Sequence, residues 1–228
     1  MLKFFSIFLL LAFFIACSST RNTATSKIPG ATVKLTTDSG VIVLRLYNQT
    51  PLHRDNFLKL VKQHYFESLL FHRVIKNFMI QGGDPVSKNA KPGILLGDGG
   101  PKYTIPAEFD TSLFHKKGVL AAAREGDDIN PKKASSGSQF YIVQGKKFTD
   151  AGLDSVETFR LKGRKLPYSH REVYKTIGGT PHLDMNYTVF GEVESGLEAV
   201  DKIAGASRDS NNRPLNDIRM KMKIVRKK

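Results

Sequence analysis

The stretch FHRVIKNFMIQGGD, residues 71–84, is the part of this chain that decides its fold. Two short apolar runs, 69–75 and 78–81, are separated by polar residues, and the turn signal Gly82-Gly83 follows the second run. Short runs between turn residues are typical of β-strands. Arg73 lies within the first run, and an arginine in such a setting is in most proteins a surface cation that extends into water. Taken alone, the stretch predicts a pair of strands and no particular chemistry.

Further short strands are predicted on both sides of this stretch. Val33 and Leu35 alternate with polar residues, and an Asp-Ser-Gly turn separates them from the run 41–46, which predicts a β-hairpin. The other runs of strand length are 119–123, 140–143, 188–193 and a last strand in which Ile218, Met220, Met222 and Ile224 alternate with charged residues. Because closure removes exposed strand edges, we expect a mainly β domain built as a closed antiparallel barrel.

Two helices are expected to cap this barrel. Thr50 and Pro51 supply an N-cap and a proline at the first helical position, and apolar residues recur at helical spacing as far as about Tyr65. Residues 195–198 form a capping box that predicts a second helix through Ile203.

Residues 149–179 depart from the β pattern. Within them, residues 169–172 form another capping box, and Gly178-Gly179 supplies a stop signal. We therefore expect a largely helical insertion on the barrel surface. The sequence leaves its role open between a partner surface, a stabilising cover and an elaboration that a loop accepts at little cost.

The N-terminal residues have the pattern of an export signal. Lys3 is followed by the run 4–16, in which only one residue is polar. A membrane-spanning helix needs about 20 apolar residues, whereas a signal-peptide core needs about 7–15. We expect residues 1–16 to be a signal peptide, residues 17–30 a flexible tether, and residues 31–228 the folded domain.

Cys17 closes the apolar run and is the only cysteine of the chain. The segment Phe14-Ile15-Ala16-Cys17 resembles the lipobox of bacterial lipoproteins, which implies lipidation at Cys17 and a lipid anchor in a bacterial cell membrane. Ser18 after the cysteine is compatible with outer-membrane sorting, but the membrane and the face stay open. The alternative is an ordinary secretory signal that happens to contain a cysteine.

The formal net charge of +14 raises the question of a nucleic-acid partner. The basic residues are scattered apart from the C-terminal KMKIVRKK, and neither an RNP-type nor a C₂H₂ pattern is present. No G-x-S-x-G, P-loop or H-E-x-x-H motif occurs either, so we expect no nucleic acid, no cofactor and no metal. Attraction to anionic lipid headgroups near the anchor is a secondary expectation.

Four ordered blocks of sequence carry a family resemblance. The stretch 71–84 resembles the signature strand pair of cyclophilins, and the blocks GVLAAA (118–123), GSQFYIV (137–143) and PHLDMNYTVFGEV (181–193) follow in the family's order. The resemblance covers about 31–224, interrupted by the insertion. It implies an eight-stranded cyclophilin-like barrel and peptidyl-prolyl cis/trans isomerase activity on proline-containing segments of exported proteins. We expect a monomer.

The resemblance also implies the site residues. It gives Arg73 as the catalytic arginine, with Phe78 and Gln81 beside it. The residues implied to contact the substrate are Met79, Ala123, Arg124, Gln139, Tyr141, His182, Leu183 and Tyr187. An arginine suits the reaction, because a fixed donor aimed at the twisted prolyl nitrogen would bind the transition state more tightly than the ground state.

Departures from the family pattern bear on this expectation. His182 stands where many eukaryotic members have a tryptophan that binds cyclosporin, which predicts weak inhibition by that drug. Tyr187 and Tyr141 also differ from the usual histidine and phenylalanine. The competing hypothesis is a non-catalytic module or chaperone that binds proline-containing segments on the same fold.

Overall fold

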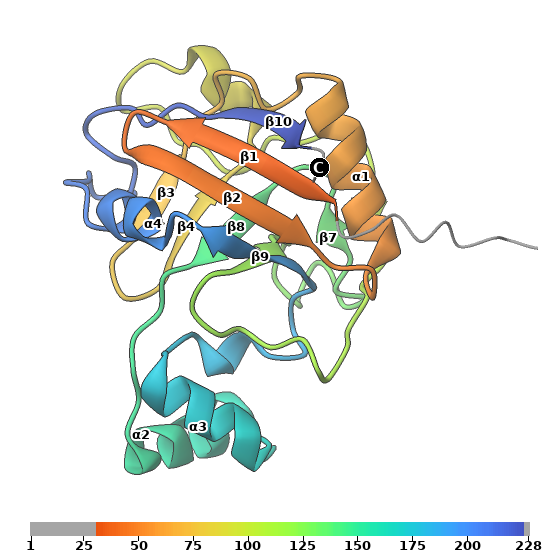
Figure 1. The fold of residues 1–228 in the computed structure, drawn as a ribbon, viewed down its shortest axis with the longest axis vertical. Coiled ribbons are helices and arrows are strands. Elements are labelled where there is room, and N and C mark those ends of the chain that lie inside the picture. Colours follow the sequence, from red (N-terminus) through yellow and green to blue (C-terminus); the bar gives the residue numbers. More distant parts are fainter. Residues whose placement is uncertain (1–30, 226–228) are drawn as a thin grey trace, which may run out of the picture.

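The computed structural model describes residues 31–225, and most of them form one antiparallel sheet around a hydrophobic core (Figure 1). The strand order in this sheet is β10-β1-β2-β9-β6-β8-β4-β3. Its strands are β1 (Thr32–Thr37), β2 (Gly40–Leu46), β3 (Arg73–Ile75), β4 (Met79–Gly82), β6 (Val119–Ala122), β8 (Phe140–Val143), β9 (Val189–Ser195) and β10 (Lys221–Val225). A separate short pair joins β5 (Thr104–Ile105) to β7 (Ser135–Ser136).

The predicted hairpin and the later strands are confirmed. In the hairpin, β1 pairs antiparallel with β2, and the alternation of the sequence places Val33 and Leu35 in the core. On β8, by contrast, every residue is buried, because one face of that strand packs into the barrel and the other lies under surface loops.

The prediction of full closure needs a correction. The edge strands β3 and β10 do not pair with each other as strands. Instead, the segment before β3 meets the segment before β10: Phe71 N donates to Ile218 O at 3.0 Å, and Met220 N donates to Leu69 O at 2.9 Å. These few backbone bonds form a short seam, so the barrel is curled and nearly closed but lacks a continuous ladder.

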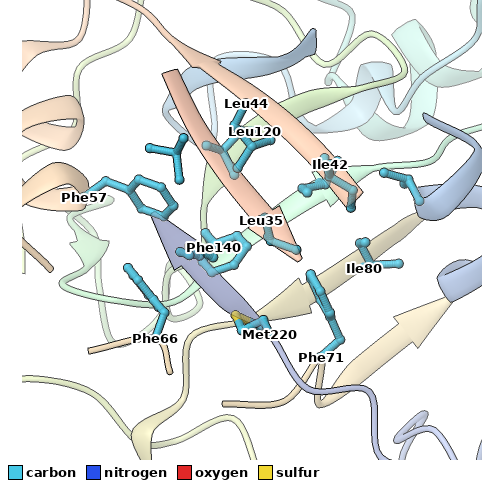
Figure 2. Close-up of a cluster of buried hydrophobic side chains, with 14 of the residues drawn as sticks. Leu35, Ile42, Leu44, Phe57, Phe66, Phe71, Ile80, Leu120, Phe140 and Met220 are labelled. Carbon is cyan, nitrogen blue, oxygen red and sulfur yellow. The ribbon is translucent and has the colours of Figure 1, made fainter. Parts of the chain in front are cut away.

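The core lies inside the curled sheet and is closed by two helices. Phe57 of α1 (Pro51–Lys62) packs with its ring centroid 5.6 Å from that of Phe140 and 5.1 Å from that of Phe66. Side chains from β1, β2, β4, β6 and β8 converge on the same cluster (Figure 2). At the opposite end of the barrel, α4 (Leu197–Ala204) buries Val200 and Ile203 in the same core (Figure 1).

Both helices exist as predicted, and α1 begins with Thr50 at the N-cap and Pro51 after it, as expected, but the capping box predicted for α4 is wrong. The Thr50 side chain makes no capping hydrogen bond to α1. Glu108, a residue distant in sequence, accepts from the backbone N–H groups of Leu52 and His53, both at 3.0 Å. At α4 the N-cap is Gly196 with φ of 94°, and a Cβ there would lie 2.1 Å from a backbone oxygen, so a glycine turn replaces the predicted serine cap.

The insertion at 149–179 is helical, as predicted, and forms a small lobe below the barrel (Figure 1). It consists of α2 (Asp150–Ser155), one π-helical turn η2 (Val156–Arg160) and α3 (Tyr168–Thr176). Ser169 lies inside α3, whose N-cap is Pro167, so the second predicted capping box is also wrong. The remaining 3₁₀ turns are η1 (Pro85–Asn89) and η3 (Pro181–Leu183).

The lobe has its own small core and one buried carboxylate. Its apolar cluster contains Leu153, Leu161, Leu166 and Tyr174. The carboxylate of Glu157 accepts hydrogen bonds from Lys165, from Arg171 and from the Leu166 backbone N–H. Burial alone would raise the pKa of Glu157, but these donors outweigh burial and lower the pKa to about 2.

No helix among residues 31–225 combines the length and the apolar character needed to cross a bilayer. The predicted signal peptide, Cys17 and the tether lie outside the described residues.

Candidate active site

Strand register brings the predicted catalytic residues together on the outer face of the barrel. Arg73 on β3 lies opposite Gln81 on β4, and Gln81 lies opposite Tyr141 on β8. Residues directly opposite each other on neighbouring strands project to the same face of a sheet. Their sequence neighbours Ile80, Phe140 and Ile142 project inward and belong to the core. The alternation of these strands therefore builds a core on one side and a site on the other.

An apolar recess of about 100 Å³ lies where these strands meet the surface loops. The residues that line it are Arg73, Phe78, Met79, Gln81, Ala123, Arg124, Tyr141, Leu183 and Tyr187. All nine are among the site residues predicted from the sequence. Since a water molecule takes roughly 30 Å³ of liquid, the recess has room for a small ring but not for a large side chain.

The guanidinium of Arg73 is held at one side of the recess by a chain of side-chain amides. Arg73 Nη1 donates to Gln81 Oε1 at 3.1 Å, and Gln81 Nε2 donates to Gln139 Oε1 at 3.0 Å. Gln139 Nε2 donates in turn to the backbone oxygens of Gly97 and Gly99. Because each amide both accepts and donates, the chain fixes the direction in which Gln81 presents its oxygen to Arg73. Gln139 thus acts from behind Gln81 and does not line the recess.

Arg73 keeps donors available for a ligand. Among residues 31–225, no carboxylate forms an ion pair with Arg73, and Gln81 is its only hydrogen-bond partner. Burial lowers the pKa of Arg73 from its usual value, but arginine remains charged at any physiological pH. Its guanidinium carbon lies 6.0 Å from the ring centroid of Phe78, so the cation stands beside the apolar surface of the recess.

Aromatic side chains form the rest of the recess wall. Tyr187 meets Tyr141 edge to face at 5.9 Å, and the Arg124 guanidinium carbon lies 4.6 Å from the Tyr187 ring centroid. His182 stacks on Phe78 with ring centroids 5.7 Å apart. His182 nevertheless lines the neighbouring hollow and not the recess itself, so the structure places this predicted contact at the rim.

Sequence reasoning missed the polar network behind Tyr141. His115 Nε2 lies 2.9 Å from the Tyr141 hydroxyl, and His115 Nδ1 lies 3.0 Å from Asp184 Oδ1. The hydroxyl of Tyr174, on α3 of the insertion, donates to both oxygens of Asp184 at 2.8 Å. In the neutral ring, Nδ1 donates to the carboxylate and Nε2 accepts from Tyr141. Burial, with the nearby Tyr187 and Asp184, raises the pKa of Tyr141 well above its usual value, so its hydroxyl keeps the proton.

Comparison with known proteins gives this site its family. The family model described as cyclophilin type peptidyl-prolyl cis-trans isomerase/CLD matches residues 32–224. The chain belongs to the cyclophilins. It is 32% identical over 187 residues to a Staphylococcus aureus protein (strain USA300) whose name gives peptidyl-prolyl cis-trans isomerase as its inferred activity, covering 82% of this chain and 87% of that protein.

Two further relatives define the extent of the likeness. This cyclophilin is 33% identical over 192 residues to a Streptococcus pyogenes protein named as an inferred bifunctional phosphatase/peptidyl-prolyl cis-trans isomerase; the match covers 83% of this chain but 37% of that longer protein. A crystal structure of a Cryptosporidium parvum cyclophilin type isomerase shares the fold, with a TM-score of 0.64 and 23% identity over 87% of this chain and 99% of that chain.

A second polar cluster in this cyclophilin has the layout of a hydrolase triad but not its access. His53 Nε2 lies 2.9 Å from Ser135 Oγ, and His53 Nδ1 lies 2.7 Å from Glu108 Oε2. Ser135 is 1% exposed, and the adjacent space has a volume of about 10 Å³. A substrate has no open path to this buried hydroxyl, so we assign the cluster the structural role of joining α1 to the Glu108 segment and to β7.

Proposed function

We propose that this cyclophilin accelerates rotation about X-Pro bonds in exported proteins, with Arg73 as the catalytic cation. The observation that carries the proposal is a charged guanidinium with unused donors, fixed beside an apolar recess. A related Cryptosporidium parvum cyclophilin was crystallised in the presence of the dipeptide Ala-Pro, which supports a proline-containing ligand for the recess here.

The physical problem that the site solves is amide conjugation. The trans form of an X-Pro bond is favoured by only about 0.5–1 kcal/mol, but rotation crosses a barrier of about 18–20 kcal/mol because C–N conjugation is lost. As the bond twists, the prolyl nitrogen becomes pyramidal and regains a lone pair. A donor that meets this lone pair binds the twisted state more tightly than the planar one, and only such differential binding speeds the reaction.

The residues of the site divide this task. Phe78, Met79 and Leu183 hold the proline ring in the recess, while Arg73 presents its N–H groups toward the nitrogen. Gln81 is a positioning residue, since its oxygen holds Arg73 Nη1. The apolar surroundings also favour the less dipolar twisted amide, so burial and the cation act in the same direction.

The test compares cis/trans exchange of an Ala-Pro peptide, measured by NMR, for wild type and Arg73→Ala. Removal of one preorganised donor costs about 10²- to 10³-fold in rate, and we expect a fall in kcat/KM of that size. The control is Arg208→Ala, because Arg208 is an exposed arginine away from the recess. Equal rates for wild type and Arg73→Ala would refute the assigned role, and background rates with retained peptide binding would favour the non-catalytic module.

Export and lipidation form a separate part of the proposal. They rest on the apolar run 4–16 and on the segment that ends at Cys17. In a bacterial host fed an alkyne-tagged palmitate, the full chain should incorporate the label and fractionate with membranes, and Cys17→Ser should do neither. An unlabelled wild-type chain that keeps residues 1–16 would refute this part alone.

A further inference from the structure

A second hollow, of about 520 Å³, adjoins the recess of this cyclophilin. The two share Arg124, Leu183 and Tyr187, so they are continuous along the surface. One wall of the hollow comes from residues 160–164 of the insertion, and the other walls come from the segments 124–133 and 182–187.

The hollow is strongly basic. The cations that line it are Arg124, Lys133, Arg160, Lys162 and Arg164, and the carboxylates that line it are Asp127 and Asp184. The Asp184 carboxylate is buried and already accepts from Tyr174 and from His115, and Asp127 pairs with Arg124. The acidic groups of the hollow are therefore already engaged.

Several of its cations form no hydrogen bond or ion pair with a carboxylate of the described residues, although the charges of Lys133 and Lys162 help to lower the pKa of Asp127. Among the described residues 31–225, no hydrogen bond or ion pair involves the side chain of Arg160 or that of Lys162, and both residues are exposed. Arg164 donates only to the backbone oxygen of Asp184, and Lys133 only to Asn186. The positive charge at this wall is consequently available to a ligand.

The pKa of His182, which lines the hollow, is affected by this positive charge. Burial lowers the pKa of His182 to about 4, and the positive charge of Arg160 contributes to the same shift. His182 is therefore neutral at physiological pH and does not add to the charge. Arg160 and His182 both line the hollow, which places Arg160 near the rim of the proline recess.

The hollow at the other end of the recess has a different character. That hollow, of about 550 Å³, shares Gln81, Ala123 and Arg124 with the recess. Its charged lining residues are Asp98, Glu125 and Arg124. A chain whose proline fills the recess thus passes from a weakly acidic hollow on one flank to a basic hollow on the other.

We propose that the basic hollow is a subsite for an acidic side chain of the client polypeptide, on one flank of the proline, with Arg160 and Lys162 of the insertion as its specificity-determining residues. The inference rests on the proposed isomerase function. It also assigns a role to the insertion, which supplies the cationic wall. An exposed ion pair changes binding by a factor of about 1.5 to 5, and because such factors multiply, two such cations should favour an acidic client by about 2- to 25-fold.

The test uses peptides blocked at both ends, each with one Ala-Pro bond and with Glu or Gln at one, two or three residues before or after the proline. The readout is the ratio of kcat/KM for Glu to that for Gln. We expect a ratio of about 2 to 25 on one flank and near 1 on the other. On the favoured flank, the ratio should fall toward 1 in about 1 M salt, where the Debye length is about 3 Å.

Variants assign the effect to the hollow. Arg160→Gln with Lys162→Gln should bring the ratio to about 1. The matched control is Lys91→Gln with Lys132→Gln, which removes the same charge from exposed lysines that do not line the hollow and should keep the wild-type ratio. A ratio near 1 on both flanks in wild type, or a ratio that survives in the Arg160/Lys162 variant, would overturn the subsite.

The failure of the subsite and the failure of the proposed function are separable. If wild type turns over the neutral peptides no faster than background, the proposed function fails. The same fluorescently labelled peptides, titrated by anisotropy, then decide the subsite alone: tighter binding of Glu peptides that depends on Arg160 and Lys162 supports it, and equal binding of Glu and Gln peptides refutes it.

Discussion

Replacing Tyr174 with phenylalanine removes one hydroxyl from the network that joins the insertion to the proline recess. That hydroxyl donates to both oxygens of Asp184 at 2.8 Å, and Tyr174 is fully buried. A hydrogen bond to a charged group contributes about 1.5–3 kcal/mol, and no water can replace the donor at a buried position without rearrangement. The free energy of unfolding should therefore fall by about 1.5–3 kcal/mol.

The assay is chemical denaturation of wild type and Tyr174→Phe, followed by thermal unfolding. For a domain of this size, each kcal/mol shifts Tm by about 2–4 °C, which predicts a drop of about 3–12 °C. Tyr168→Phe is the control, because Tyr168 lies on the same helix α3 and is 78% exposed. A Tyr174→Phe variant within about 0.5 kcal/mol of wild type, the range of ordinary surface substitutions, would show that Asp184 does not depend on this donor.

Three other substitutions test separate parts of the structure. Glu108→Gln removes the negative charge of the carboxylate that accepts hydrogen bonds from two N–H groups at the start of α1, and should lower the free energy of unfolding by about 1–3 kcal/mol in a denaturant titration. An unchanged denaturation midpoint would contradict the role of Glu108 as the acceptor for these N–H groups. The pKa of Glu157 is lowered to about 2, so the stability that its carboxylate gives the insertion is complete above about pH 4.5 and is lost as the pH falls toward 2. Cleavage of the insertion by pepsin should therefore increase over that pH range in wild type. The Glu157→Gln variant should be cleaved readily already at about pH 4.5. Arg160→Gln should raise the pKa of His182 from about 4 but leave it below 6.5, because burial is the larger cause of the shift. If an NMR titration shows no rise in the pKa of His182, the two side chains do not face each other.

Much of the fold could be predicted because its signals are local. The alternation of Val33 and Leu35, and the apolar run 140–143, needed only neighbouring residues to indicate strands, and both strands are present. The residues of the recess could be predicted from the motif at 71–84. Residues two positions apart on a strand project to the same face, and Met79 and Gln81 both line the recess. Nine of the eleven site residues expected from the sequence line this recess, and Gln139 and His182 lie beside it.

What the sequence could not indicate depends on residues that are distant along the chain. Thr50 is the N-cap residue, but the side-chain acceptor for the first N–H groups of α1 is Glu108, and no local sequence pattern indicates an acceptor so far along the chain. The Tyr141, His115 and Asp184 contacts join residues 26 and 69 positions apart, so their spacing carries no periodic signal. The Ser195 box failed for a different reason, since the chain needs a left-handed residue at Gly196 to turn from β9 into α4.

The pairing of β1 with β10 has a consequence for how this protein is made. Thr32 lies opposite Val225, so β1 can pair with one of its two neighbouring strands only after residue 225 has been synthesised. Pairings between such distant segments are slow to form, because the whole intervening chain must first be brought into a loop. Until β10 has emerged, one edge of β1 lacks its backbone partners, so the sheet of this cyclophilin cannot be completed before residues 221–225 are available.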